Sequence, residues 1–268
     1  MICTSGYRKG LRLALACAAL AAPASAGSLE QHRTADENRG WEAVGRLNLG
    51  ENGFCTGSLV TSDIVLTAAH CLFDRRTGGR IPPADIEFQA GLRFGEAEAY
   101  RGVRRIVLHP AYDFDEPHRL VRVGSDLALL ELDHPVRSGQ VLPFRTQFRI
   151  SAGAQVQVLS YARDRAEAPS REDSCQVLTR DADVLVLSCS VDFGASGAPV
   201  FAQFGGERRI VSVISAKASW EERPVALAAA MEGELDVLLA EFARTPALSE
   251  VGERIDVQGP TELSTRGP

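Results

Sequence analysis

Short apolar runs alternate with turn-forming residues along most of the chain. In several runs apolar and polar positions alternate, as in Ile86-Glu87-Phe88 and Gln155-Val156-Gln157-Val158, which is the period of a half-buried strand. This spacing predicts an all-β sandwich or barrel fold. Eleven runs are predicted as strands: 44–49, 58–60, 64–68, 86–90, 103–109, 127–132, 155–160, 184–187, 199–202, 210–215 and 225–229.

One stretch near the C-terminus, 231–243, has the period of an amphipathic helix. Because it follows the last predicted strand, the helix is expected to pack on the outside of the sheets. Residues 245–268 carry few large apolar side chains and predict a flexible tail, and 27–40 form a similarly polar N-terminal segment. The apolar face of the predicted helix is formed by Leu235, Leu238, Leu239 and Phe242.

The first 26 residues have the three parts of a secretory signal. Basic side chains precede an apolar run at 11–22, which is too short to span a bilayer, and Ala24-Ser25-Ala26 matches a small-x-small cleavage site. This order favours a cleaved signal over a membrane anchor. We therefore expect export to the periplasm or the medium, with Gly27 as the first mature residue.

The charge balance narrows the range of partners. The formal net charge is -6, and it becomes -9, from 26 basic and 35 acidic residues, once the signal is removed. An acidic chain is a poor match for nucleic acid or for an anionic membrane surface, so neither is expected as a partner. With 45% hydrophobic residues the chain is typical of a soluble globular protein, and we expect a monomer.

Export also changes the meaning of the cysteines, because disulfides form in oxidising compartments. Four cysteines lie outside the signal and allow three connectivities, but they cluster in the sequence as two local pairs. We predict Cys55–Cys71 and Cys175–Cys189, each stabilising the fold by roughly 3 kcal/mol in the chain-entropy model. A zinc site is the disfavoured alternative, since no Cys-x-x-Cys pair is present, and we expect no metal.

Three separated segments carry candidate chemistry. His70 lies between a predicted strand and Cys71, where it would be fixed as a general base must be. Asp126 opens an apolar run, and a carboxylate buried there needs a partner. Ser196 lies among glycines, which allow backbone N–H groups to approach a ligand closely. Each residue alone also fits a structural role, but together, in the order His, Asp, Ser, they indicate nucleophilic catalysis.

The motifs around these residues resemble those of the chymotrypsin-like (trypsin-like) serine peptidases over most of 41–230. Thr67-Ala68-Ala69-His70-Cys71 is identical to the histidine motif of that family, and Asp126-Leu127-Ala128-Leu129-Leu130 is similar to its aspartate motif. Gly194-Ala195-Ser196-Gly197-Ala198-Pro199 resembles the Gly-Asp-Ser-Gly-Gly-Pro motif with two alanine replacements. Cys189, shortly before the serine, is similar to a cysteine of bacterial secreted, glutamyl-endopeptidase-like members.

The resemblance implies two perpendicular six-stranded antiparallel β-barrels, with the active site in the cleft between them and a helix at the C-terminus. The implied organisation is a signal peptide at 1–26, the polar segment at 27–40, a first barrel at 41–145, a second barrel at 146–230, the helix at 231–244 and the tail at 245–268.

It also implies a role for each candidate residue. The Ser196 hydroxyl would attack the scissile carbonyl, His70 would take its proton, and Asp126 would fix the imidazole tautomer. The backbone N–H groups of Gly194 and Ser196 would receive the oxyanion. The expected activity is that of a secreted serine endopeptidase that hydrolyses proteins or peptides through an acyl-enzyme, without metal or organic cofactor.

The substrate pocket is expected to involve Ser190, Val191, Ser215 and Lys217. Ser190 occupies the position where trypsin-like enzymes carry an aspartate that selects basic residues, and Ile214 the position of the histidine that selects glutamate in bacterial glutamyl endopeptidases. We therefore expect an uncharged or mixed preference at the residue before the cut. Ser215 also matches a family serine that hydrogen-bonds the aspartate.

Two alternatives remain to be weighed. A catalytically inactive homologue acting as a binding module stays open because Ala195 and Ala198 depart from the family motif. An α/β-hydrolase esterase is disfavoured, since it needs Gly-x-Ser-x-Gly on a strand-to-helix turn and alternating helices.

The four other histidines, predicted to lie on the surface, are His32, His109, His118 and His134.

Ala195 also affects the expected route of activation. In zymogens of this family an aspartate before the serine pairs with a newly freed N-terminal ammonium and so forms the oxyanion hole. Alanine cannot accept that ion pair, and a buried ammonium without a carboxylate is unfavourable. We therefore expect local packing of 193–199 and the Cys175–Cys189 bridge to hold the oxyanion hole.

Overall fold

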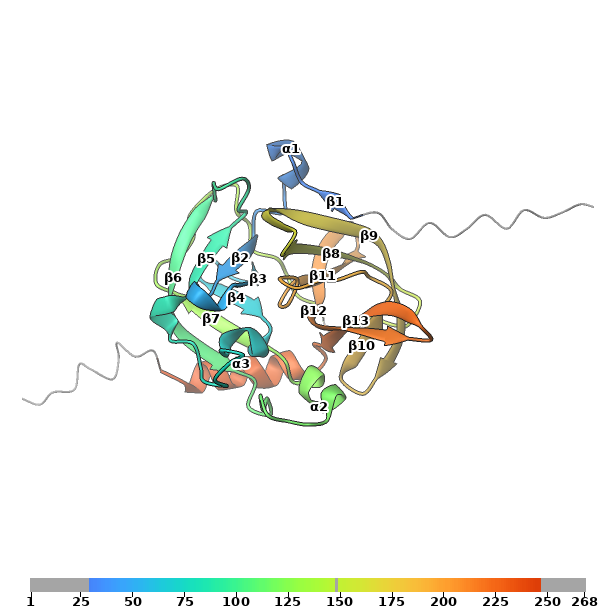
Figure 1. The fold of residues 1–268 in the computed structure, drawn as a ribbon. Helices are drawn as coiled ribbons and strands as arrows, with labels where there is room; N and C mark the ends of the chain where they lie inside the picture. The colour runs from blue at the N-terminus through green and yellow to red at the C-terminus, as the bar shows by residue number, and fades with distance from the viewer. Residues whose placement is uncertain (1–28, 148, 247–268) are drawn as a thin grey trace, which may run out of the picture.

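The computed structural model describes residues 29–147 and 149–246, which form two sheets side by side (Figure 1). The predicted signal and residues 247–268 of the predicted tail lie outside the described residues. Within the described part of the chain, no helix is long and apolar enough to cross a membrane.

The first sheet is a closed barrel of six strands. They are β2 (Val44–Asn48), β3 (Phe54–Leu59), β4 (Ile64–Thr67), β5 (Glu87–Ala90), β6 (Ala99–Leu108) and β7 (Ala128–Leu132). The order around the barrel is β2-β3-β4-β7-β6-β5, and neighbouring strands are antiparallel. Its core contains the fully buried side chains of Leu47, Leu66, Phe88 and Leu129, which come from different strands. These alternating apolar positions are the ones that the sequence pattern uses to predict strands.

The second sheet has seven strands. They are β1 (Glu30–Gln31), β8 (Gln155–Ala162), β9 (Arg165–Asp181), β10 (Val184–Leu187), β11 (Pro199–Phe204), β12 (Glu207–Trp220) and β13 (Arg223–Ala230). Their order is β1-β9-β10-β13-β12-β11-β8, and a further pairing between β8 and β9 closes six of them into a ring. Strand β1 is added to the outside of this ring through β9. The predicted all-β class with two six-stranded barrels is thus confirmed.

Strand β9 is the longest strand of the described chain, and the sequence pattern does not predict it. Its buried positions are filled by small or polar side chains, including Ala168, Ser170 and Glu172, so the usual apolar alternation is missing. Only Cys175 and Val177, which are buried on either side of the exposed Gln176, show an apolar alternation. The strand forms because its backbone pairs with β8 on one side and β10 on the other, which supplies hydrogen bonds that the side-chain pattern does not reveal.

The predicted C-terminal helix is confirmed as α3 (Glu234–Arg244). It follows the last strand of the second sheet, but it packs against β6 and β7 of the first barrel (Figure 1). Leu235 and Leu238 are buried there, and the Arg105 guanidinium lies 3.8 Å from the centre of the Phe242 ring. The helix therefore ties the two barrels together. Short elements that the sequence does not predict are α1 (Ala35–Asn38), α2 (Arg119–Gly124), and the 3-10 helices η1 (Gly50–Asn52), η2 (Ala69–Leu72) and η3 (Pro83–Asp85).

The polar N-terminal segment packs onto the second sheet through β1, which pairs with β9. Helix α1 begins with a capping box between Thr34 and Glu37. His32 is buried, with Nδ1 3.3 Å from the Asn38 amide oxygen, and it packs against Trp41. The prediction of a surface position for His32 is therefore wrong, because the ring has a polar partner on each side: Asn38 at Nδ1 and, from β9, Arg171 Nη1 at 3.4 Å from Nε2.

The surface prediction is also wrong for His109, which is buried with Nε2 3.0 Å from Glu234 Oε2 on α3. Burial lowers the pKa of both His32 and His109. His118 and His134 are exposed, as predicted.

Both predicted disulfides are present. Cys55–Cys71 links β3 to η2, and Cys175–Cys189 links β9 to the segment that leads to Ser196. Each bridge therefore anchors a segment that carries candidate chemistry.

Candidate active site

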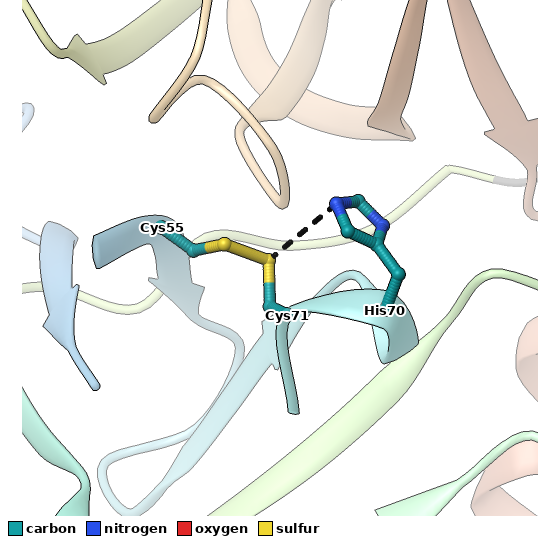
Figure 2. Close-up of side chains that lie close together, drawn as sticks. All are labelled: Cys55, His70 and Cys71. Atoms are coloured by element: carbon teal, nitrogen blue, oxygen red, sulfur yellow. Dashed lines mark hydrogen bonds between the residues drawn. A yellow bond between two sulfur atoms is a disulfide. The ribbon is translucent and has the colours of Figure 1, made fainter. Parts of the chain in front are cut away.

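His70 is held in place by the turn that contains it. The residue lies in η2, directly after β4, and the neighbouring Cys71 is tied to β3 by the first disulfide (Figure 2). His70 Nε2 lies 4.0 Å from Cys71 Sγ. Cys55, His70 and Cys71 bring three possible metal ligands within 4.8 Å of one another, but the two sulfurs are bonded to each other and are not thiolates. The cluster is therefore suited to fixing the imidazole and not to binding a metal.

Asp126 is the partner of His70. The carboxylate is buried, with 2% of the residue exposed, and its Oδ2 lies 2.6 Å from His70 Nδ1. Oδ1 accepts the His70 backbone N–H at 2.8 Å, and Oδ2 also accepts the Ser215 hydroxyl at 2.5 Å. Three donors thus compensate for the burial of this carboxylate. Because Nδ1 faces a carboxylate, it carries the ring proton, which leaves Nε2 as an acceptor.

The loop around Ser196 leaves two backbone N–H groups free. Within the described part of the chain, the N–H groups of Gly194 and Ser196 donate to no acceptor. Every other N–H from 193 to 198 is hydrogen-bonded. Phe193 donates to Asp192 Oδ1 (2.8 Å), Ala195 to Asp192 O (3.0 Å), Gly197 to Ile214 O (2.8 Å) and Ala198 to Ala195 O (3.0 Å). The free pair is the one that the sequence assigns to the oxyanion hole.

The two glycines of this loop are required by its geometry. Gly194 has φ +98°, and a Cβ there would lie 2.4 Å from the Phe54 ring. Gly197 has φ +79°, and a Cβ would lie 2.1 Å from Thr67 Oγ1. Neither position accepts a side chain without a shift of its surroundings. The alanines that replace the family residues, Ala195 and Ala198, are both buried.

A cavity of about 600 Å³ brings the candidate residues together. His70, Asp126 and Ser196 line it, together with Val191, Phe193, Ser215 and Lys217. Ser196 and His70 share this cavity without a hydrogen bond between them in the described chain. A second cavity of about 290 Å³ is lined by His70, Gly194 and Ser196 together with Phe54 and Arg163. The two cavities meet at Ser196.

The predicted pocket residues differ in their surroundings. Lys217 Nζ lies 2.9 Å from Asp192 Oδ1, so its charge is paired. This ion pair lowers the pKa of the Asp192 carboxyl. Ser190 does not line the cavity. The Ser190 side chain is exposed, and its backbone N–H donates to Glu172 Oε2 at 2.9 Å.

Glu172, the acceptor of the Ser190 N–H, is not among the residues predicted from the sequence. It is buried on β9, with 4% exposed, and burial raises the pKa of its carboxyl to about 7. The folded chain therefore holds a proton between about pH 4.5 and 7 that the unfolded chain has released, so stability decreases as the pH rises through this range.

We expect Glu172→Gln to stabilise the fold at pH 8 by about 2 kcal/mol and to have little effect near pH 4.5. The amide oxygen can still accept the Ser190 N–H, and the cost of a buried charge is gone. Urea denaturation at both pH values measures the difference. Glu232→Gln is the control, and at pH 8 it should lower the stability of the fold. The Arg180 hydrogen bond lowers the pKa of Glu232, so its ionised carboxylate is stabilising. An equal change for Glu172→Gln at both pH values would contradict the prediction.

The fold and the His–Asp–Ser cavity define a class, the chymotrypsin-like serine proteases. The family model described as "Trypsin" matches residues 30–223, and the chain belongs to this family.

Two curated relatives and one solved structure agree with this assignment. Mannan-binding lectin serine protease 1 of Homo sapiens is 35% identical over 109 residues, which is 36% of this chain and 15% of that protein. The modular serine protease of Drosophila melanogaster is 38% identical over 96 residues, 33% of this chain and 14% of that protein. The chain thus spans a small part of these relatives. A solved structure of a Glu endopeptidase in complex with MPD matches in fold, with a TM-score of 0.67 and 16% identity, over 81% of this chain and 98% of that one.

Proposed function

We propose that this chain is a serine endopeptidase that hydrolyses peptide bonds through an acyl-enzyme on Ser196. The observation that carries the proposal is that the His70–Asp126 pair and Ser196 line one cavity, and that Gly194 lines the second cavity, which meets the first at Ser196. In the described part of the chain the N–H groups of Gly194 and Ser196 donate to no acceptor. In this proposal Ser196 attacks the scissile carbonyl, His70 Nε2 takes the hydroxyl proton and later gives it to the leaving amine, and Asp126 orients the ring. Gly194 and Ser196 N–H groups stabilise the oxyanion.

The two cavities support cleavage within a chain. Because both reach Ser196, a substrate can extend in both directions from the scissile bond. Protein or peptide substrates follow from this shape. Export through the predicted signal is part of the proposal, and the two disulfides are in keeping with an oxidising compartment. The similarity of Cys189 to bacterial secreted members stays a prediction.

One observation favours the inactive alternative. Ser196 and His70 are not hydrogen-bonded to each other in the described chain, and an inactive binding module would not need this hydrogen bond. Catalytic hydrogen bonds are, however, often long in the absence of substrate and tighten in the Michaelis complex. Turnover decides between the two functions.

We expect the purified chain to cleave a broad peptide library, with uncharged residues enriched before the cut and a fluorophosphonate inhibitor abolishing cleavage. The physical reason is that the Lys217 charge is paired with Asp192, and that Ser190, which lies outside the cavity, brings no carboxylate to it for Arg or Lys. Sequencing of the products gives the preference. A profile dominated by Arg and Lys would refute the proposed pocket, and a wild-type chain without any turnover or inhibitor labelling would refute the peptidase function.

A further inference from the structure

Thr56 connects the first barrel to the loop that carries Ser196. The residue lies on β3 and is completely buried. Each of its polar groups has a partner. Its N–H donates to Ser196 O (2.8 Å), its Oγ1 donates to Gly194 O (2.9 Å) and accepts from Tyr161 N (3.1 Å), and its carbonyl accepts from Thr67 Oγ1 (2.8 Å).

The contacts of Thr56 bear on the direction of the Gly194 N–H. Two peptide planes flank Gly194. In the first, the Phe193 carbonyl accepts from Arg163 N at 2.8 Å, and because C=O and N–H of a trans peptide point in opposite directions, the Gly194 N–H points away from Arg163. In the second, the Gly194 carbonyl is held by the Thr56 hydroxyl, and the Ala195 N–H is held by Asp192 O. With both planes fixed, the Gly194 N–H keeps one orientation.

The same threonine also holds the peptide that follows the second donor, while the Ala195–Ser196 peptide that carries this donor is held by the Ala198 N–H, which donates to Ala195 O at 3.0 Å. The Ser196 carbonyl accepts the Thr56 N–H, and the Gly197 N–H of the same peptide donates to Ile214 O. The Thr56 hydroxyl is itself oriented, because it must accept the Tyr161 N–H and therefore directs its own proton to Gly194. These contacts come from the first barrel, from β8 and from β12, and none of them involves a chain terminus.

Resting on the proposed function, we propose that Thr56 is a positioning residue whose hydroxyl preforms the oxyanion hole and takes the place of an N-terminal ion pair. The buried position before the serine is Ala195, which cannot accept an ammonium. In this chain the neutral Thr56 hydroxyl on the first barrel takes the role that the family's aspartate has before the serine. The oxyanion hole then exists without proteolytic activation.

The main test is Thr56→Val, which keeps the shape of the side chain and removes the hydroxyl. We expect kcat to fall about 10- to 100-fold with KM changed less than about twofold, because the donors act on the oxyanion and not on the ground state. Thr56→Ser restores the hydroxyl and should stay within about threefold of wild type. Thr56→Ala gives a second hydroxyl-free variant in case valine does not fit.

A second readout separates positioning from general stability. A peptide boronic acid forms a tetrahedral adduct on the serine, so its Ki should rise in proportion to the loss of kcat. Ser212→Ala is the matched control, because its buried hydroxyl donates to Ala229 O within β12 and β13 and makes no contact with the loop. It should lower stability and leave kcat and Ki unchanged.

The inference would be overturned by a kcat within twofold of wild type for both Thr56→Val and Thr56→Ala, by an equal kcat loss in Ser212→Ala, or by a loss confined to KM. Acetylation of the N-terminal amine of the wild type should leave kcat unchanged, and a large loss on acetylation would also refute it. The peptidase function is tested separately, since each of these results requires a wild type that turns over.

Discussion

Replacing Ser196 by alanine should lower kcat/KM for a peptide substrate by about 10⁵- to 10⁶-fold. In the proposed mechanism the hydroxyl forms the covalent intermediate, and no neighbouring group in the cavity can replace it. The backbone contacts of residue 196 do not depend on the hydroxyl, since its carbonyl accepts from Thr56 and its N–H donates to no acceptor among the described residues. The thermal midpoint should therefore stay within about 2 °C of the wild-type value. Progress curves and thermal denaturation measure the two effects.

The control for this variant is Ser219→Ala, at an exposed position of β12 outside both cavities. It should keep wild-type turnover and wild-type labelling by a fluorophosphonate probe, whereas Ser196→Ala should lose both. If Ser196→Ala retained probe labelling, the nucleophile would be another residue. If it lost activity only because it had unfolded, the denaturation curve would show this.

The strands that bury apolar side chains at alternating positions were predictable, because apolar and polar residues alternate along them in the sequence. Strand β9 was not, since its stability comes from pairing on both edges and its buried positions hold Ala168, Ser170 and Glu172. The same limit applies to β1, which is too short to show a period. In both cases the information lies in the partner strands and not in the segment itself.

The site shows a similar division. The sequence motifs are sufficient to propose His70, Asp126 and Ser196, because each motif contains the residue type that the chemistry needs. Thr56 could not be proposed in this way, since its hydroxyl acts on Gly194, 138 positions away. Its only signal in the sequence is that a threonine follows Cys55 in a predicted barrel segment. Such long-range contacts require the folded chain.

Asp126→Asn should lower kcat about 10⁴-fold at neutral pH, because the amide enforces the wrong tautomer of His70. The geometry determines how the asparagine must lie. The backbone N–H of His70 needs an acceptor, so the amide oxygen takes the place of Oδ1. The amide nitrogen then takes the place of Oδ2 and faces His70 Nδ1, to which it donates. The ring proton moves to Nε2, and Nε2 can no longer accept the proton of Ser196.

Ser215→Ala separates this tautomer effect from a simple loss of hydrogen bonds at Asp126. It removes one donor to Oδ2 but leaves both bonds from His70, so kcat should fall by about tenfold or less. Nitrogen-15 NMR of labelled histidine should show the His70 proton on Nδ1 in Ser215→Ala and on Nε2 in Asp126→Asn. A kcat for Asp126→Asn within tenfold of wild type would contradict the proposed role of Asp126, because the buried carboxylate would then serve only to hold the turn at His70.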